Sequence, residues 1–178
     1  MAELLLAHQI VTGDKNMVLL EFRLSEEILR EDRRFNPGMA DTGALSETYF
    51  CMPVRMKIGC AELLEMPVRS QGKEPSYWLP LPLLDVATTG LEAVKEAKQK
   101  ERAVYSLPGS GSRLYFEVNG NEVSVYSQVN GRSARANYDK LLQAFNKFVL
   151  KVREVLKHEV PELMNHPYWG KWLKSEIE

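Results

Sequence analysis

The sequence predicts an α+β fold in which an antiparallel β-sheet, made of a meander and hairpins, packs against a long C-terminal α-helix. Asn-Gly pairs at 119–120 and 130–131 separate short segments of alternating apolar residues, and Asn-Gly favours the tight turns of β-hairpins. Apolar residues then recur every three or four positions over 138–156, as in a helix with one apolar stripe. We therefore expect a three-stranded meander over 113–136 and, after it, a helix of about 20 residues that packs on the sheet.

The composition favours one folded unit. The chain has 178 residues, of which 44% are hydrophobic and 26% charged, so it is long enough and apolar enough to bury a core. We expect residues 1–178 to form a single α+β domain. There are 23 basic and 24 acidic residues, and this balance provides no global field that would attract nucleic acid or an anionic membrane.

The first residues do not have the pattern of a targeting sequence. Glu3 stands where a signal peptide needs positive charge, and the apolar run that follows is too short for a signal peptide's hydrophobic region. No stretch has the ~20 apolar residues needed to cross a bilayer. We expect a cytoplasmic protein that does not contact a membrane.

The N-terminal third predicts a hairpin, a short helix and a loop. Residues 3–11 and 17–24 are apolar runs on either side of a turn-forming cluster at 12–16, which predicts the hairpin. Ser25 stands directly before two glutamates and can cap a short helix that begins after it. Residues 31–46 have no periodicity and contain a Pro-Gly pair, so we expect a long loop there.

A half-buried strand is predicted over 48–58, because every second residue belongs to a mostly apolar face and the residues between them form a face of mixed polarity. Pro53 lacks the N–H that a central strand needs, so we expect a sheet edge or a bulge at this point, and such an edge could pair in a homodimer. Residues 60–67 are expected to pair back on this strand. An exposed loop is expected over 71–75, and two prolines argue against regular structure over 77–83.

The middle of the chain predicts another helix and another strand. Thr89 and Glu92 have the spacing of a capping box, which predicts a helix near 90–100. A start near Leu84 is the alternative. A strand is expected over 102–107, before a glycine-rich hairpin loop.

The C-terminal helix has boundary signals of its own. Asn137 can cap its first turn, and Pro161 ends or restarts the helix. An aromatic tail follows, with Tyr168, Trp169 and Trp172. We expect this tail to close one end of the core.

No pattern predicts a catalytic set, a metal site or a cofactor site. The three histidines, His8, His158 and His166, form no pair on consecutive helical turns. Cys51 and Cys60 are nine positions apart, too far for a disulfide if both lie on one extended segment. We expect both to be reduced, buried thiols.

The exposed side of the predicted meander is the candidate binding surface. It combines tyrosine and arginine, which dominate the energetics of protein interfaces. The candidate partner-binding residues are Arg113, Tyr115, Tyr126, Arg132 and Arg135. Basic groups beside aromatic rings on a sheet could also bind nucleic acid. Three arginines in a chain of net charge −1 are a weak signal for nucleic-acid binding, so we expect an ordinary solvated face or a protein-binding face instead.

The order of the C-terminal elements resembles a known class of proteins. A meander at 113–136 runs directly into an amphipathic helix at 138–156 and then into the sequence Pro-Glu-Leu-Met-Asn-His-Pro-Tyr-Trp at 161–169. This order is similar to that of the small α+β immunity-type proteins of bacterial toxin and immunity systems, which bind and block one cognate toxin. The resemblance covers about the last 75 residues and rests on architecture. It implies a non-catalytic inhibitor whose partner is another protein.

Two alternatives stay open at this point. One is a small-molecule-binding domain or an enzyme, with a pocket between the sheet and the C-terminal helix and with functional residues dispersed along the chain. The other is a nucleic-acid-binding module that uses the arginines and tyrosines of the meander.

Overall fold

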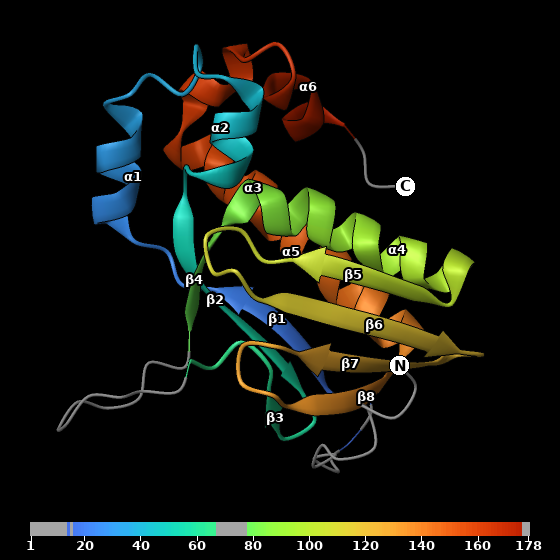
Figure 1. Ribbon diagram of the computed structural model, residues 1–178. Helices are drawn as coiled ribbons and strands as arrows, with labels where there is room; N and C mark the ends of the chain where they lie inside the picture. Colours follow the sequence, from blue (N-terminus) through green and yellow to red (C-terminus); the bar gives the residue numbers. More distant parts are fainter. Residues whose placement is uncertain (1–13, 15, 67–77, 176–178) are drawn as a thin grey trace, which may run out of the picture.

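The computed structural model describes residues 14, 16–66 and 78–175 and confirms the α+β class. It contains two four-stranded antiparallel sheets, shown in Figure 1. The first sheet contains β1 (Val18–Phe22), β2 (Cys51–Ile58), β3 (Ala61–Glu62) and β4 (Leu79–Pro82). The second contains β5 (Arg102–Ser106), β6 (Arg113–Asn119), β7 (Glu122–Ser127) and β8 (Ser133–Asn137). The α-helices are α1 (Glu26–Arg33), α2 (Thr42–Glu47), α3 (Leu83–Asp85), α4 (Leu91–Lys100), α5 (Tyr138–Glu159) and α6 (Trp169–Lys174).

The second sheet consists of the predicted meander and the strand expected before the glycine-rich hairpin loop. Its strands follow the order β5-β6-β7-β8, so every strand pairs with its neighbour in sequence. Gly120 and Gly131 have φ values of +61° and +72°, which is the left-handed conformation that a glycine adopts without steric cost. The two Asn-Gly turns are therefore confirmed, and β5 extends the meander to four strands.

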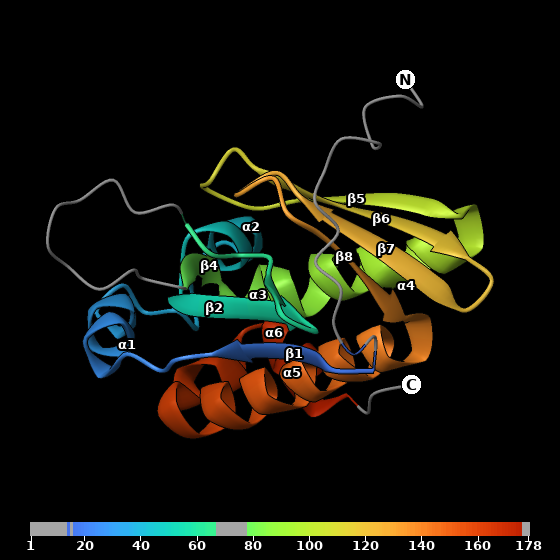
Figure 2. The same cartoon turned by 90° about the horizontal axis from the view of Figure 1, so that it is seen from below.

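Helices α4 and α5 stack behind the second sheet. The long C-terminal helix is confirmed, and the Asn137 side chain caps it by accepting a hydrogen bond from the Lys140 amide at 3.2 Å. Helix α4 contacts β5 and β6, whereas α5 contacts α4 and the first-sheet strand β1. Figure 2 shows α5 continuing from the end of β8 and lying alongside β1. The buried apolar residues of both sheets and of these helices form one cluster.

Strand β2 lies inside the first sheet, so the expectation of an edge at Pro53 is wrong. It pairs with β1 on one side and with β4 on the other. The Pro53 carbonyl accepts a hydrogen bond from the Arg23 amide, so the backbone of Pro53 faces β1 just beyond the end of that strand. Pro80 stands opposite Pro53 on β4, in a pair that needs no hydrogen bond between the two strands. Both prolines therefore fit, and the expectation of irregular structure over 77–83 is wrong for β4.

Two other expectations for the first half need correction. The loop expected over 31–46 contains the end of α1 and most of α2, because the Asp41 carboxylate caps α2 through the Gly43 and Ala44 amides at 2.9 and 3.1 Å. Cys60 is exposed rather than buried, and Cys51 is only partly buried, although both thiols are free.

Several N-terminal predictions are confirmed where the structure describes them. The Ser25 hydroxyl accepts a hydrogen bond from the Ile28 amide and caps α1. Residues 17–24 supply β1, and β3 pairs back on β2 as expected. The predicted partner of β1 in a hairpin, residues 3–11, and the predicted loop 71–75 lie outside the described residues.

The helix before β5 begins earlier than its capping-box pattern predicts. Helical structure starts at Leu83, passes through a π-helical turn at Val86–Gly90 and continues as α4. Thr89 therefore lies inside the helix and is not its cap, so the alternative start near Leu84 is confirmed. The π-helical turn places Gly90 against the rings of Phe145 and Tyr105.

The aromatic tail closes one end of the core, as expected. A 3₁₀ turn at Pro161–Asn165 follows α5 and leads to α6. The indole N–H of Trp169 donates to the Thr42 carbonyl at 3.3 Å, and the His166 ring bonds the Ala40 carbonyl at 3.0 Å. Over the described ranges, no helix combines the length and apolar character needed to cross a membrane.

Candidate functional site

The outer face of the β5–β8 sheet is the surface on which the predicted binding residues can be placed. Side chains alternate along each strand, and the inward set, such as Phe116 and Val125, is buried beneath α4 and its neighbours. The outward set is exposed or half-buried. No described helix or strand crosses this outer face in Figure 1. The face is therefore open to solvent as far as the described chain extends.

Two tyrosines form the centre of this face. Tyr115 on β6 and Tyr126 on β7 are directly opposite each other, with ring centroids 5.8 Å apart and planes tilted by 38°. Val104 pairs with Tyr115 from the β5 side, and Ser133 pairs with Tyr126 from the β8 side. These four residues form a continuous row across the sheet, which we call the tyrosine row. The Val104 side chain adds apolar area to this row because it is 50% exposed.

A second row, one pleat away, is made of charged and polar residues. The register places Arg102, Glu117, Ser124 and Arg135 side by side across the four strands. Arg102 pairs with Glu117 at 3.2 Å, and Arg135 pairs with Glu122 at 3.5 Å. A polar hollow of about 570 Å³ lies over this row. Together with Glu122 beside it, the row contains two arginines and two glutamates, so it has little net charge.

The structure brings together four of the five predicted binding residues. Arg113 begins β6, is exposed, and lies on the same side of the strand as Tyr115. Arg135 lies in the charged row next to the tyrosines. Arg132 differs, because it belongs to the β7–β8 turn and its guanidinium pairs with Glu65 and reaches the Glu62 carbonyl at 3.3 Å. It therefore connects the second sheet to the segment after β3.

Other residues of the face were not identified from the sequence. Arg102, Val104 and Glu117 all contribute exposed atoms to the two rows. The signal that could have identified them is the hairpin expected around the glycine-rich loop at 108–112, since that hairpin fixes the register between 102–107 and the next strand.

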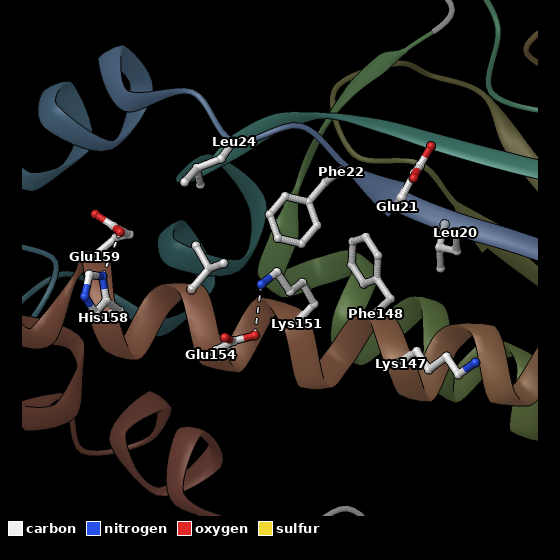
Figure 3. Close-up of a pocket in the computed structure, with 11 residues that line it drawn as sticks. Leu20, Glu21, Phe22, Leu24, Lys147, Phe148, Lys151, Glu154, His158 and Glu159 are labelled. Atoms are coloured by element: carbon white, nitrogen blue, oxygen red, sulfur yellow. Dashed lines mark hydrogen bonds and ion pairs between the residues drawn. The ribbon is translucent and has the colours of Figure 1, made fainter.

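A groove lies on the other side of the molecule, between β1 and α5 (Figure 3). This β1–α5 groove has a volume of about 640 Å³. Its floor is apolar, and charged side chains stand on its rim, among them the ion pair of Lys151 with Glu154 at 2.9 Å. The apolar lining residues are Leu20, Phe22, Leu24, Phe148 and Val155.

Two side chains in the core have raised pKa values. Asp85 and Tyr105 are buried and hydrogen bonded to each other, and burial raises the pKa of both groups. Both side chains are closed off from solvent, so this pair has no path to a substrate in the conformation described. Across residues 14, 16–66 and 78–175, no three His, Cys, Asp or Glu side chains gather in a group that could hold a metal ion.

Comparisons of this chain with protein-family models, with curated proteins and with solved structures find no match.

Proposed function

We propose that this chain is a non-catalytic, immunity-like or inhibitor-like domain that binds a cognate protein partner through the outer face of its β5–β8 sheet. The observation that supports this proposal is the Tyr115–Tyr126 pair at the centre of a sheet face that no described helix or strand crosses, with Arg113 and Arg135 beside it. Tyrosine offers a large contact area at low entropic cost, and arginine adds directed hydrogen bonds.

The charge pattern favours a protein over a nucleic acid as the partner. Arg102 and Arg135 have carboxylates beside them on the same face, and Arg132 pairs with Glu65. A phosphate backbone is bound mainly by unneutralised positive charge, which these pairs reduce. A protein surface that carries both positive and negative groups is a better electrostatic match for this charged row.

The immunity-like aspect of the proposal rests on the order of elements. A meander that leads directly into a long amphipathic helix presents a rigid sheet face, because α4 packs behind β5 and β6 and α5 packs on α4 in turn. A rigid face binds at a low cost in conformational entropy, which is what a tight inhibitor of one partner needs.

The test begins with the full chain as bait at physiological salt, and the partner is identified by mass spectrometry. Its affinity is then measured by calorimetry for Tyr115→Ala, Tyr126→Ala and Arg135→Ala. We expect losses of about 30-fold for the tyrosines, as for interface hot spots. Lys157→Ala, on the exposed side of α5, is the matched control. Unchanged affinity in all three folded variants would remove the outer face as the binding surface.

A second candidate function is small-molecule binding in the β1–α5 groove. Its volume of about 640 Å³ lies within the range of ligand sites, and its floor is apolar. Thermal-shift screening of the full chain against a library of amphiphilic and aromatic compounds tests this candidate. Val155→Lys should abolish any stabilisation by a compound that binds there, whereas Leu150→Lys, on an exposed part of α5, should not.

A further inference from the structure

Strand β5 forms one edge of the second sheet, because it pairs with β6 on one side and no described strand pairs with it on the other. The Val118 amide donates to the Glu101 carbonyl at 2.8 Å, and the Leu107 amide donates to the Ser112 carbonyl at 2.9 Å. The two sides of an antiparallel strand alternate, so the odd-numbered residues of β5 face β6. The residues whose backbone N–H and C=O groups point away from β6 are Arg102, Val104 and Ser106.

This edge has little of the protection that usually prevents strand pairing. Natural sheet edges are blunted by prolines, bulges, charges or a covering element. β5 contains no proline, its one charged residue stands at an end, and its central residue, Val104, is 50% exposed. Helix α4 lies behind the sheet and not along the edge, because it contacts β6 as well as β5 and is placed between the second sheet and α5 (Figure 2). Such an edge is a template for another extended strand.

A second copy of β5 fits this template. Only outward-pointing backbone groups can bond across the edge, so positions 102, 104 and 106 must face the same positions of the other copy. The antiparallel register centred on Val104 uses all three, with Val104 facing Val104 and Arg102 facing Ser106 at both ends. Shifted registers use fewer positions, and the register centred on Arg102 would place two guanidinium groups opposite each other, which is unfavourable. The edge is therefore self-complementary in one register.

The helices behind the two edge strands can meet without a conflict of charge. Lys98 of α4 donates to the Gly120 carbonyl at 2.6 Å, so this side of the helix faces the β6–β7 turn, away from the edge of β5. Residues two positions before and after Lys98 lie about 200° around the helix, on the side of the edge. They are Glu96 and Lys100, which form an ion pair at 2.6 Å. This side of α4 is therefore neutral and can lie next to its own copy.

We propose that two copies of this chain pair antiparallel through their β5 edges, about a two-fold axis at the Val104–Val104 pair. The two four-stranded second sheets then form one continuous sheet, and the tyrosine row of one copy continues through Val104 into that of the other. This edge differs from the one expected at Pro53, which lies inside the first sheet. The pairing does not depend on whether the outer face binds a protein partner, and the purified chain alone is enough to test it.

Sedimentation velocity of the full chain measures the association. We expect twice the mass of a single chain at about 100 μM and dissociation on dilution, as for a small interface. Val104→Lys should have the mass of a single chain at the same concentration, because it places two ammonium groups opposite each other. Leu150→Lys adds the same charge to an exposed part of α5 and should leave the dimer intact. A single-chain mass of the unmodified protein at every concentration up to about 1 mM would overturn the proposal.

Hydrogen exchange of single amides, measured by NMR, locates the pairing. The amides of Val104 and Ser106 point outward and should exchange at least about tenfold more slowly in the dimer than in dilute protein. The amides of Ala103 and Tyr105 are the internal control, because they face β6 and should exchange equally at both concentrations. A dimer in which the Val104 and Ser106 amides exchange as they do in dilute protein would use another surface and would overturn the proposal.

Cysteine cross-linking tests the register. Cys51 and Cys60 are first replaced by serine, because both thiols are free. Val104→Cys should then give a disulfide-linked dimer under mild oxidation, since facing residues have Cα atoms about 5.5 Å apart, within disulfide reach. Ser124→Cys is the matched control, because it lies on the same outer face but on β7, two strands from the edge. Cross-linking of Ser124→Cys, or failure of Val104→Cys to cross-link, would overturn the proposed pairing.

Discussion

The phenolic hydroxyl of Tyr105 donates a 2.6 Å hydrogen bond to the carboxylate Oδ2 of Asp85 inside the core. Tyr105 comes from β5 and Asp85 from the helix that precedes α4, so this bond joins the second sheet to the helix packed behind it. Both side chains are almost fully buried, with exposures of 2% and 7%. A buried carboxylate that loses a donor retains its desolvation cost without compensation.

Tyr105→Phe should therefore destabilise the fold by about 1–3 kcal/mol, although it keeps the ring and removes only the hydroxyl. Urea unfolding at neutral pH measures the change. Tyr168→Phe is the control, since the Tyr168 side chain is 54% exposed and should tolerate loss of its hydroxyl. Equal stabilities for Tyr105→Phe and the unmodified protein would contradict this role of the bond.

The same pair predicts a dependence of stability on pH. Burial raises the pKa of Asp85 above its ordinary value of 3.8, and the nearby Glu47 carboxylate adds to this rise, while hydrogen bonds from Tyr105 and Thr89 oppose it. The folded state thus holds this proton to a higher pH than the unfolded state. The stability that Asp85 contributes is complete below pH 3.8 and is lost as the pH rises through the folded-state pKa.

Asp85→Asn removes this titration and keeps an acceptor for Tyr105. The free energy of unfolding of the variant, relative to the unmodified protein, should rise with pH above 3.8, by up to about 1.4 kcal/mol per pH unit, and then level off. Urea unfolding of both proteins at several pH values between 3.5 and 7 (about half-unit steps) provides the difference curve. A difference that stays constant over this range would show that Asp85 does not titrate differently in the folded state.

Features of the fold that depend on neighbouring residues could be predicted from the sequence, whereas features that depend on residues far apart in the chain could not. The Asn-Gly turns and the caps at Ser25 and Asn137 involve neighbouring residues, so local patterns predicted them correctly. The π-helical turn before α4 has no such pattern. It follows from the packing of Gly90 against two rings that come from distant parts of the chain.

The prolines of β2 and β4 show the same limit. A proline excludes a central position only if its nitrogen faces a neighbouring strand that needs the N–H. Pro53 and Pro80 face each other in a pair that makes no such bond, and this register depends on the pairing of segments that are far apart in sequence. Likewise, strand alternation placed Tyr115 and Tyr126 on one face, but the sequence could not show that Arg132 turns away toward Glu65.

Gly90→Ala should destabilise the protein, although alanine favours helices. An added Cβ would lie 3.1 Å from Cε1 of Phe145 and 3.4 Å from Cε1 of Tyr105, and both rings are buried. The expected cost is about 1–3 kcal/mol from this overpacking, more than the ~1 kcal/mol gain in helix propensity. Thermal unfolding measures it, with Lys95→Ala on the exposed side of α4 as the control. A stabilised Gly90→Ala variant would show that the rings can move apart at little cost.

The contact between Arg153 and Trp172 predicts how the C-terminal tail is held. The guanidinium lies over the indole at 4.5 Å and donates to the carbonyl and hydroxyl oxygens of Ser175 at 2.8 and 2.9 Å. Its Nε is buried and has no acceptor among the residues that the structure describes, and burial lowers the pKa of the group. The cost of burying this charge therefore offsets much of what its contacts contribute.

We expect Arg153→Met to change the free energy of unfolding by less than about 1 kcal/mol, because methionine keeps the packing and removes the buried charge. Trp172→Ala should cost about 2 kcal/mol or more, because it removes the ring that covers this part of α5. Urea unfolding of the two variants separates the contributions of charge and packing. If Arg153→Met proves as damaging as Trp172→Ala, the charge itself holds the tail in place, through a cation–π contact and hydrogen bonds that outweigh its desolvation.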